Sequence, residues 1–205
     1  MNEEKTKAKI FASATKLFGE RGKDGVSTGE IARDAKINKA LIFYYFHTKD
    51  ELYRTVFKSV MNEFVENVRR EISEVEPGLP AVEAFVRSHI KVLEENKYMA
   101  NMMTRELLFS DAKKSTAIRR DFAAVFKTLR NDMLRALSSA RTSGQVRDID
   151  PLQTIVSIVS LDVFFFLWRP LVLMINPASD SEKFGSERID HVVDLLMNGL
   201  RKHQG

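Results

Sequence analysis

Apolar residues recur every three or four positions along almost the whole chain, and this spacing restricts the possible folds more than any other feature. No stretch shows the strict apolar–polar alternation that a half-buried β-strand would have. A helix has 3.6 residues per turn, so residues at the observed spacing share one face and are buried together. We therefore expect an all-α protein with about nine helices and no internal repeat.

Short stretches rich in Pro and Gly interrupt this pattern. The first helix is expected to end at Arg21-Gly22, and "EVEPGLP" to end a long fourth helix. In the loop "RTSGQVRDIDP", Gly144 suits a helix C-cap and Asp150-Pro151 a helix start. A short methionine-containing helix is expected to end near Phe109, and the penultimate helix near Arg169.

Charge and cysteine content narrow the functional classes. The 205 residues include no cysteine, which excludes disulfides, thiolate zinc sites and cysteine nucleophiles and fits a reducing cytoplasm. The net charge of +4 is uneven, because residues 1–50 hold 10 Lys and Arg against 7 Asp and Glu. A basic N-terminal quarter on a nearly neutral body indicates nucleic acid or another anionic surface as a partner.

The most apolar stretch, "IVSIVSLDVFFFLWRPLVLMI", raises the question of a membrane span. Asp162 near its middle and the pair Arg169-Pro170 argue against a spanning helix. We expect a buried helix or a subunit interface instead, and no contact with a membrane.

Three helix-start signals lie close together between residues 27 and 51. Ser27-Thr28-Gly29-Glu30 and Thr48-Lys49-Asp50-Glu51 match the capping box, in which a hydroxyl caps the helix and a Glu three positions later reaches back. Asn38, between them, is a good N-cap. The signals define a short helix, a turn and a second short helix, which is the layout of a helix-turn-helix whose second helix enters the DNA major groove.

The second of these helices contains four consecutive aromatic residues, Phe43-Tyr44-Tyr45-Phe46. Successive helical residues lie ~100° apart, so one core cannot bury all four rings. Ile42 and Phe46 share the face that must pack on Ile31. The tyrosines then lie near Lys49 and a helix N-terminus, where hydroxyls and free N–H groups suit phosphates. The alternative is that all four rings are core contacts.

At this point "STGEIARDAKINKALIFYYFHTKDELY", preceded by "IFASATKLFGERG", resembles the DNA-binding module of the TetR family of bacterial transcriptional regulators. The resemblance covers roughly the first 60 residues. It implies a helix-turn-helix DNA-binding domain at residues 1–60, with the motif itself at about 28–47. Residues 61–205 would then form a helical bundle for effector binding and dimerisation.

The resemblance also implies roles for single residues. Thr28 would bind a phosphate, although it could be only a cap residue, and Lys39 would face the bases. Gly29 lacks a side chain that could read a base. Lys36 stands where the family usually has glycine, and a left-handed backbone there would cost about 1 kcal/mol. The positions expected to contact DNA are Thr28, Gly29, Lys36, Lys39, Ala40, Leu41, Phe43, Tyr44, Tyr45, His47 and Lys49.

In the body of the protein we expect an effector pocket and a dimer interface. His89 lies on an apolar stripe, either as a hydrogen-bonded core residue or as a group that orients a ligand. Expected pocket residues, which could equally be ordinary core, are Phe85, His89, Met102, Met103, Arg105, Phe126, Phe164, Phe165 and Trp168. The last two helices are the candidates for dimerisation, through Ile189, Val192, Val193, Leu196 and Leu200, unless this stripe packs inside one subunit.

An enzyme is not expected. The four histidines have no paired metal-ligand spacing, no Gly-x-Ser-x-Gly is present, and "GERGKDG" lacks the spacing of a phosphate-binding loop. We expect neither a metal nor a cofactor. The expected function is a ligand-responsive repressor that binds a palindromic operator as a homodimer and is released by a small, largely apolar effector. The alternatives are a DNA-binding regulator without a small-molecule effector and, less favoured, a structural interaction protein or a helical enzyme.

Overall fold

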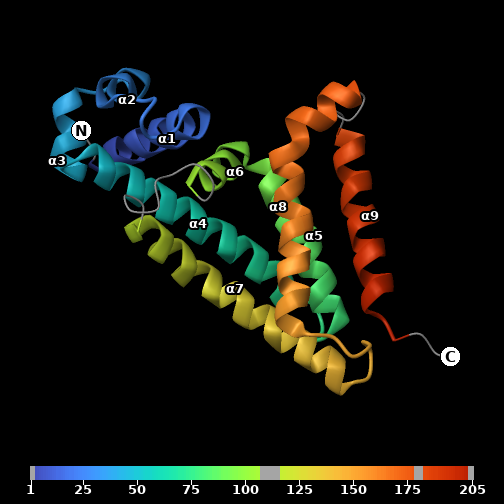
Figure 1. Cartoon of the computed structure of the whole chain (residues 1–205). Coiled ribbons are helices and arrows are strands. Elements are labelled where there is room, and N and C mark those ends of the chain that lie inside the picture. Colours follow the sequence, from blue (N-terminus) through green and yellow to red (C-terminus); the bar gives the residue numbers. More distant parts are fainter. Residues whose placement is uncertain (1–2, 107–115, 178–181, 203–205) are drawn as a thin grey trace. The chain divides into compact units, whose positions relative to one another are not determined.

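The computed structural model describes residues 3–106, 116–177 and 182–202, and this part of the chain is all-α, as predicted (Figure 1). The expected end of a helix near Phe109 lies outside the described residues. The helices are α1 (Glu3–Arg21), α2 (Thr28–Asp34), α3 (Lys39–Phe46), α4 (Lys49–Ser73), α5 (Leu79–Glu95), α6 (Lys97–Thr104), α7 (Thr116–Thr142), α8 (Pro151–Ile175) and α9 (Glu182–Leu200).

Side-chain caps begin four of these helices at the residues that the sequence predicted. Each cap satisfies a backbone N–H that has no partner inside its own helix. The N–H groups of Glu30, Ala40, Glu51 and Gln153 donate to the side chains of Ser27, Asn38, Thr48 and Asp150, respectively. The helix ends agree as well, since Gly22 after α1 and Gly144 after α7 adopt φ values of 74° and 70°.

The predicted end of the penultimate helix was wrong. Helix α8 continues through Pro170 to Ile175 instead of stopping near Arg169. Proline removes one helical hydrogen bond and crowds the preceding turn, so it bends a helix where the following residues still favour helix. The ribbon of α8 accordingly changes direction near its C-terminal end (Figure 1).

The helices form two compact units. The first contains residues 1–63 and 96–124, and therefore holds the whole expected DNA-binding segment together with α6. Within it, α1 packs on α2 and α6, and α2 packs on α3. Its core includes Ile10, Ala14, Phe18, Ile31, Ile42, Leu52, Val56 and Phe57.

The second unit contains residues 64–95 and 125–205. Helix α5 is at its centre and packs on both α8 and α9. Its core includes Phe64, Val82, Phe85, Ile90, Met133, Leu137, Ile158 and Val192. Because α5 is buried along most of its length, α8 and α9 must each supply one apolar face to cover it.

Candidate nucleic-acid interface and ligand cavity

Helix α3 divides its aromatic run between an inner and an outer face. Ile42 is fully buried and Phe46 nearly so. By contrast, 43% of Phe43 and 71% of Tyr44 are exposed to solvent. The predicted burial of Ile42 and Phe46 on the inner face of α3 is confirmed. The Phe43 and Tyr44 rings lie on the outer face and are not part of the core of the first unit.

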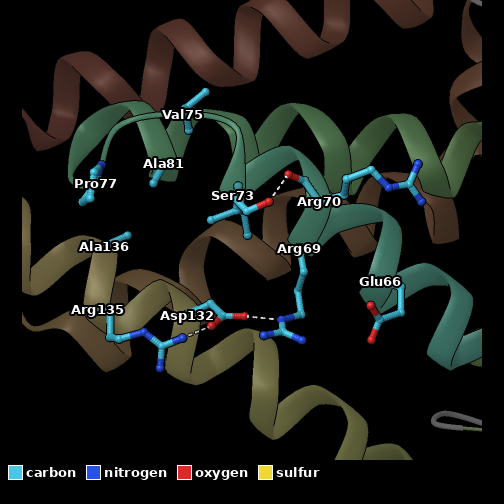
Figure 2. A pocket seen from close by; sticks show the side chains of 11 residues that line it. Glu66, Arg69, Arg70, Ser73, Val75, Pro77, Ala81, Asp132, Arg135 and Ala136 are labelled. Carbon is cyan, nitrogen blue, oxygen red and sulfur yellow. Dashed lines mark hydrogen bonds and ion pairs between the residues drawn. The ribbon is translucent and has the colours of Figure 1, made fainter.

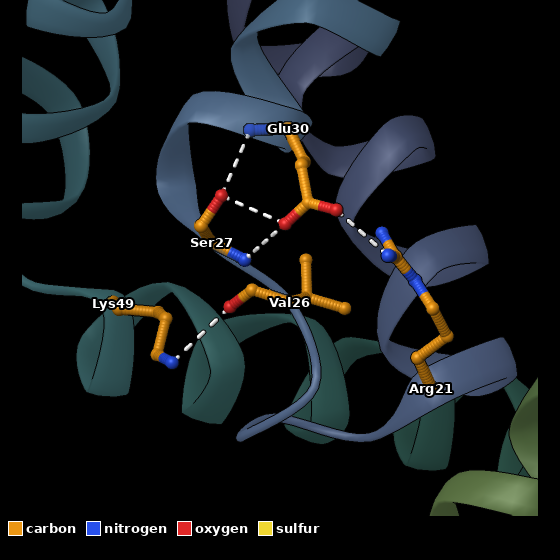
Figure 3. Close-up of polar contacts among 5 residues, drawn as sticks. All are labelled: Arg21, Val26, Ser27, Glu30 and Lys49. Atoms are coloured by element: carbon orange, nitrogen blue, oxygen red, sulfur yellow. Dashed lines mark hydrogen bonds and ion pairs between the residues drawn. The ribbon is translucent and has the colours of Figure 1, made fainter.

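The capping box of α2 also ties this helix to α1 (Figure 3). The Ser27 N–H donates to the Glu30 carboxylate at 2.8 Å, and Arg21 at the end of α1 donates to the same carboxylate at 2.7 Å. The backbone and hydroxyl of Ser27, followed by Arg21, lower the pKa of Glu30 to about 2. The first helix of the helix-turn-helix is therefore held at its start by charge-assisted hydrogen bonds.

Two residues of the motif have a backbone that glycine would adopt more easily. Lys36, in the turn, has a φ of 55°, which is the left-handed backbone that the sequence analysis considered at this position. His47, directly after α3, has a φ of 53°. A β-carbon is crowded in this region of backbone space. Both side chains are exposed, so the turn and the end of α3 each place a polar or basic group on the outside.

Lys49 makes contacts that the sequence did not indicate. Its ammonium donates to the carbonyl oxygens of Lys23 and Val26, at 3.0 and 3.2 Å, and so joins the start of α4 to the loop before α2 (Figure 3). These bonds use two of the three N–H groups of the Lys49 ammonium. In this structure the main role of Lys49 is therefore to connect α4 to the loop before α2. Thr28 is buried at the first position of α2.

Cations gather around the outer rings of α3. The Lys39 ammonium lies 5.8 Å from the centre of the Phe43 ring, and the Lys7 ammonium 5.1 Å from that of Tyr45. The sequence did not single out Lys7, because the contact joins two helices that are far apart in the chain. Among the other expected DNA contacts, Ala40 is exposed and Gly29, Leu41 and Tyr45 are half-buried.

The second unit contains a small cavity of about 150 Å³. Its walls come from α5, α7 and α8 and are almost entirely apolar. Three of the expected pocket residues line it, namely Phe85, His89 and Phe126. The remaining lining residues are Leu129, Arg130, Met133, Ile155 and Val159.

The other expected pocket residues do not line this cavity. Met102 and Met103 are buried in the core of the first unit, and Arg105 donates to the Glu20 carbonyl at the end of α1. Phe164 and Trp168 are exposed on α8, and Phe165 packs against Phe184 of α9. Sequence spacing placed all of these residues on apolar faces but could not assign the faces to one site.

His89 forms a buried pair that the sequence reasoning missed. Its Nδ1 atom lies 2.8 Å from Asp162 Oδ2, and each residue is only 1% exposed. Burial raises the pKa of the Asp162 carboxyl, and the hydrogen bond with His89 opposes this. His89 is thus a hydrogen-bonded core residue that also lines the cavity, and a role in orienting a ligand stays a prediction. Asp162 follows the buried Ile155 and Ile158 at helical spacing. This spacing was the sequence signal that could have indicated a buried Asp162.

A larger, open groove of about 770 Å³ lies in the same unit, between the ends of α4 and α7 and the start of α5 (Figure 2). Its charged side chains are largely engaged with one another. Arg69 donates to Asp132 at 2.8 Å, and Arg135 bonds to the same carboxylate. An open site whose charges already have partners offers little selectivity for a ligand.

The apolar faces of α8 and α9 differ in how much of each is left exposed for the expected dimer contacts. Val192, Val193 and Leu200 are buried within the chain itself, because α9 covers α5, while Ile189 and Leu196 are half-buried. Val192, Val193 and Leu200 therefore pack inside one subunit, whereas a dimer contact through Ile189 and Leu196 stays a prediction. Helix α8 instead exposes apolar residues at spacings of mostly three or four, namely Leu152, Val156, Phe164, Trp168, Leu171, Met174 and Ile175.

Within the described residues, α8 is also the one helix long and apolar enough to cross a membrane. Its most apolar window has a mean hydropathy of 2.0, and 11% of that window is buried. Length and composition do not separate a membrane span from an interface helix. The buried Asp162 on the inner face of α8 gives this helix a polar partner inside the protein.

Comparisons with known proteins agree with the geometry of the first three helices. Residues 10–56 match the model of the bacterial regulatory proteins of the tetR family. The transcriptional regulator RutR of Escherichia coli K12 is 21% identical over 196 residues, which are 95% of this chain and 90% of RutR.

Two solved structures share the fold over nearly the whole chain. One is a TetR/AcrR-family regulator from Thermobifida fusca, with a TM-score of 0.74 at 20% identity, covering 98% of this chain and 100% of that one. The other is FadR from Bacillus subtilis in complex with stearoyl-CoA, with a TM-score of 0.73 at 18% identity, covering 94% and 98%. The chain thus resembles the DNA-binding transcriptional regulators of the tetR family in the sequence of residues 10–56, and it shares their fold over nearly its whole length.

Proposed function

We propose that this chain is a DNA-binding transcriptional regulator of the TetR family, namely a cytoplasmic, ligand-responsive repressor that binds a palindromic operator as a homodimer and is released by a small, largely apolar effector. The observation that carries the proposal is the division of α3 into a buried inner face and an exposed aromatic and basic outer face. An exposed recognition helix of this kind meets the duplex while its inner face keeps it in position.

The outer face of α3 supports specific roles in DNA binding. Lys39 and Ala40, exposed in the first turn of α3, would face base edges in the major groove, and Tyr44 would donate a hydrogen bond to a phosphate. Lys36 would add a charge from the turn. Lys49 would contribute mainly by holding α4 against the loop before α2, with one N–H group left for a phosphate.

The exposed stripe of α8 supports dimerisation. Soluble proteins rarely leave a continuous line of large apolar side chains in water. A second copy carries the same stripe, so a twofold axis would cover both at once. Two recognition helices would then reach half-sites ~34–36 Å apart, or a multiple of this distance, which makes the operator palindromic.

Release by an effector needs two states that the ligand distinguishes. The ligand shifts the equilibrium only by its difference in affinity for the DNA-binding and the released state. The cavity beside His89 is the proposed ligand site, and α4, continuous from Lys49 to Ser73, is the proposed physical link to the DNA-binding module. An acyl-CoA like the one in the FadR structure is far larger than this cavity.

The small volume of the cavity favours one alternative, a DNA-binding regulator that acts without a small-molecule effector. In that case the cavity would be a packing defect of the second unit. The two readings differ in one measurable property, because only the first predicts that a compound bound in the cavity changes the affinity for the operator.

The experiment begins by selecting genomic fragments that the purified protein retains. Affinity for the selected duplex is then measured by fluorescence anisotropy over a range of salt concentrations. Lys39→Ala should weaken binding roughly tenfold or more, because it removes a contact from the outer face of α3. The matched control is Lys127→Ala, at an exposed position of α7. Equal losses in both variants, or affinity that does not depend on salt, would reject the proposed interface.

A further inference from the structure

Lys7 joins the start of α1 to the aromatic run of α3. Its ammonium lies 5.1 Å from the centre of the Tyr45 ring and 3.0 Å from the Glu3 carboxylate. A cation over the face of an aromatic ring is attracted by the negative charge of that face. Thr6 and Ile10 are buried, so the core fixes the orientation of α1 and places Lys7 at the border of the buried face of this helix.

Tyr45 connects this contact to Tyr44, the ring that the proposed interface uses. The two rings meet edge to face, with 5.0 Å between their centres and 76° between their planes. Tyr45 is half-buried and also packs against the buried Phe46, at 6.5 Å between ring centres. An exposed side chain exchanges readily between rotamers, and Tyr44 is 71% exposed. The orientation of Tyr44 therefore depends on the Tyr45 ring beside it.

The order of these rings in the free protein affects the affinity for DNA. A side chain that becomes fixed only on binding loses conformational entropy at that moment, which lowers the affinity. A Tyr44 ring that is already restricted by Tyr45 loses less. Because Lys7 contacts the opposite end of this pair of rings, α1 can influence how Tyr44 meets a phosphate without contacting the phosphate itself.

Glu3 favours this indirect role over a direct charge contact. Glu3 and Lys7 are one helical turn apart, and their side chains are 63% and 50% exposed. Such an exposed ion pair contributes little to stability, but it places a negative charge beside the ammonium. Nonspecific attraction to DNA depends on net positive charge that displaces counterions. Since the Glu3–Lys7 pair carries no net charge, it adds little to that attraction.

We propose that Lys7 is a positioning residue for operator binding, which holds Tyr45 and, through Tyr45, orients the exposed Tyr44 toward a phosphate. This inference rests on the proposed DNA-binding role of the outer face of α3. It adds α1 to the elements that determine the geometry of that interface.

The test uses a double variant that leaves the net charge of +4 unchanged. Glu3→Gln/Lys7→Met removes one charge of each sign and keeps an unbranched side chain beside the Tyr45 ring. It should weaken operator binding of the full-length protein roughly two- to fivefold in fluorescence anisotropy, as expected for the loss of one exposed cation–π contact. The matched control, Glu4→Gln/Lys9→Met, alters two exposed residues of the same helix and should bind as the unaltered protein does.

A double-mutant cycle separates positioning from a direct phosphate contact. Tyr45→Leu removes the ring, so adding Glu3→Gln/Lys7→Met to this variant should cost no further affinity. Lys7→Arg keeps a cation that can lie over the ring, and it should bind the operator as the unaltered protein does. If Lys7 contacted a phosphate directly, its loss would persist in the Tyr45→Leu variant, and the slope of log affinity against log salt would become shallower by about one.

NMR of ¹³C-labelled tyrosine rings tests the contact without DNA. The signals of Tyr44 and Tyr45 are assigned with their phenylalanine variants. Glu3→Gln/Lys7→Met should shift the signals of both rings. It should leave those of Tyr53, in the core of the first unit, and Tyr98, on α6, unchanged, which shows that the fold is intact.

Each outcome decides the inference. A loss of affinity that disappears in the Tyr45→Leu variant, together with shifts of both ring signals, supports it. A loss that persists in that variant, or unchanged Tyr44 and Tyr45 signals, overturns it. If Lys39→Ala weakens binding while Glu3→Gln/Lys7→Met does not, only the positioning role fails. If neither change alters the affinity, the DNA-binding role of α3 fails, and the inference fails with it.

Discussion

Helices α3 and α8 each contain consecutive aromatic residues, at 43–46 and 164–166, and each exposes part of its run to solvent. On α3 the exposed Phe43 ring lies beside the ammonium of Lys39, and the half-buried Tyr45 ring lies beside that of Lys7. On α8 the exposed stripe continues with leucine and methionine and contains no charged residue. An exposed ring is therefore ambiguous on its own, and its polar neighbours indicate whether the missing partner is a nucleic acid or an apolar protein surface.

The largest expected effect tests the inner face of α3 against its outer face. Ile42→Ala should lower the free energy of unfolding by about 2–5 kcal/mol, because it leaves a cavity in the core of the first unit. Tyr44→Ala should change it by less than about 0.5 kcal/mol, since most of the ring is exposed, and yet weaken operator binding. Denaturant unfolding and fluorescence anisotropy measure the two effects. Similar stability losses in both variants would remove the distinction between the faces.

The next effect tests the exposed stripe of α8. Phe164→Lys should weaken dimerisation by about 2 kcal/mol, or roughly thirtyfold, because it places a charge in the proposed apolar interface. Operator affinity should fall with it. Ser138→Lys, at an exposed position of α7, should leave the dimer intact. Sedimentation velocity measures the association. If the unaltered protein is monomeric, the proposed dimer interface is refuted. If the protein is recovered in the membrane fraction, the exposed stripe of α8 contacts lipid instead.

The sequence predicted the helices and the helix-turn-helix well, because these depend on local signals. A cap and its N–H partner are two or three residues apart, as for Asn38 and Ala40, so both are visible in one short segment. The inner face of α3 was predictable for the same reason, since Ile42 and Phe46 follow each other by one helical turn.

Contacts between distant segments were not predictable in this way. The stripes of α8 and α9 are both apolar, and only the packing of α9 on α5 shows which of them is left exposed. The carbonyl groups that bind Lys49 have no signature in the sequence, because every residue carries one. Asp162 was visible as a polar residue in an apolar helix, but its partner His89 lies 73 positions earlier.

A smaller effect tests the turn that supports the outer face of α3. Lys36→Gly should stabilise the protein by several tenths of a kcal/mol to about 1 kcal/mol, because relief of the left-handed backbone exceeds the added entropy of the unfolded chain. The same change at Lys9, exposed within α1, should cost about 1 kcal/mol. Thermal or denaturant unfolding gives both values. If Lys36→Gly also weakens operator binding, the charge of Lys36 contributes to the outer face.

The smallest expected effect is a pH dependence that belongs to the α2–α3 region and not to the stripe of α8. Hydrogen bonds from Ser27 and the Arg21 contact depress the pKa of Glu30 to about 2 from its ordinary value of 4.5. Stability gained from the ionised carboxylate is therefore fully present above about pH 4.5 and is lost as the pH falls through about 2. The difference in unfolding free energy between the unaltered protein and Glu30→Gln should shrink between about pH 6 and pH 2, whereas the Phe164→Lys difference in dimerisation should not follow that titration. A Glu30→Gln difference that stays constant over this range, measured by denaturant unfolding at each pH, would show that the carboxylate charge does not hold α2 in place.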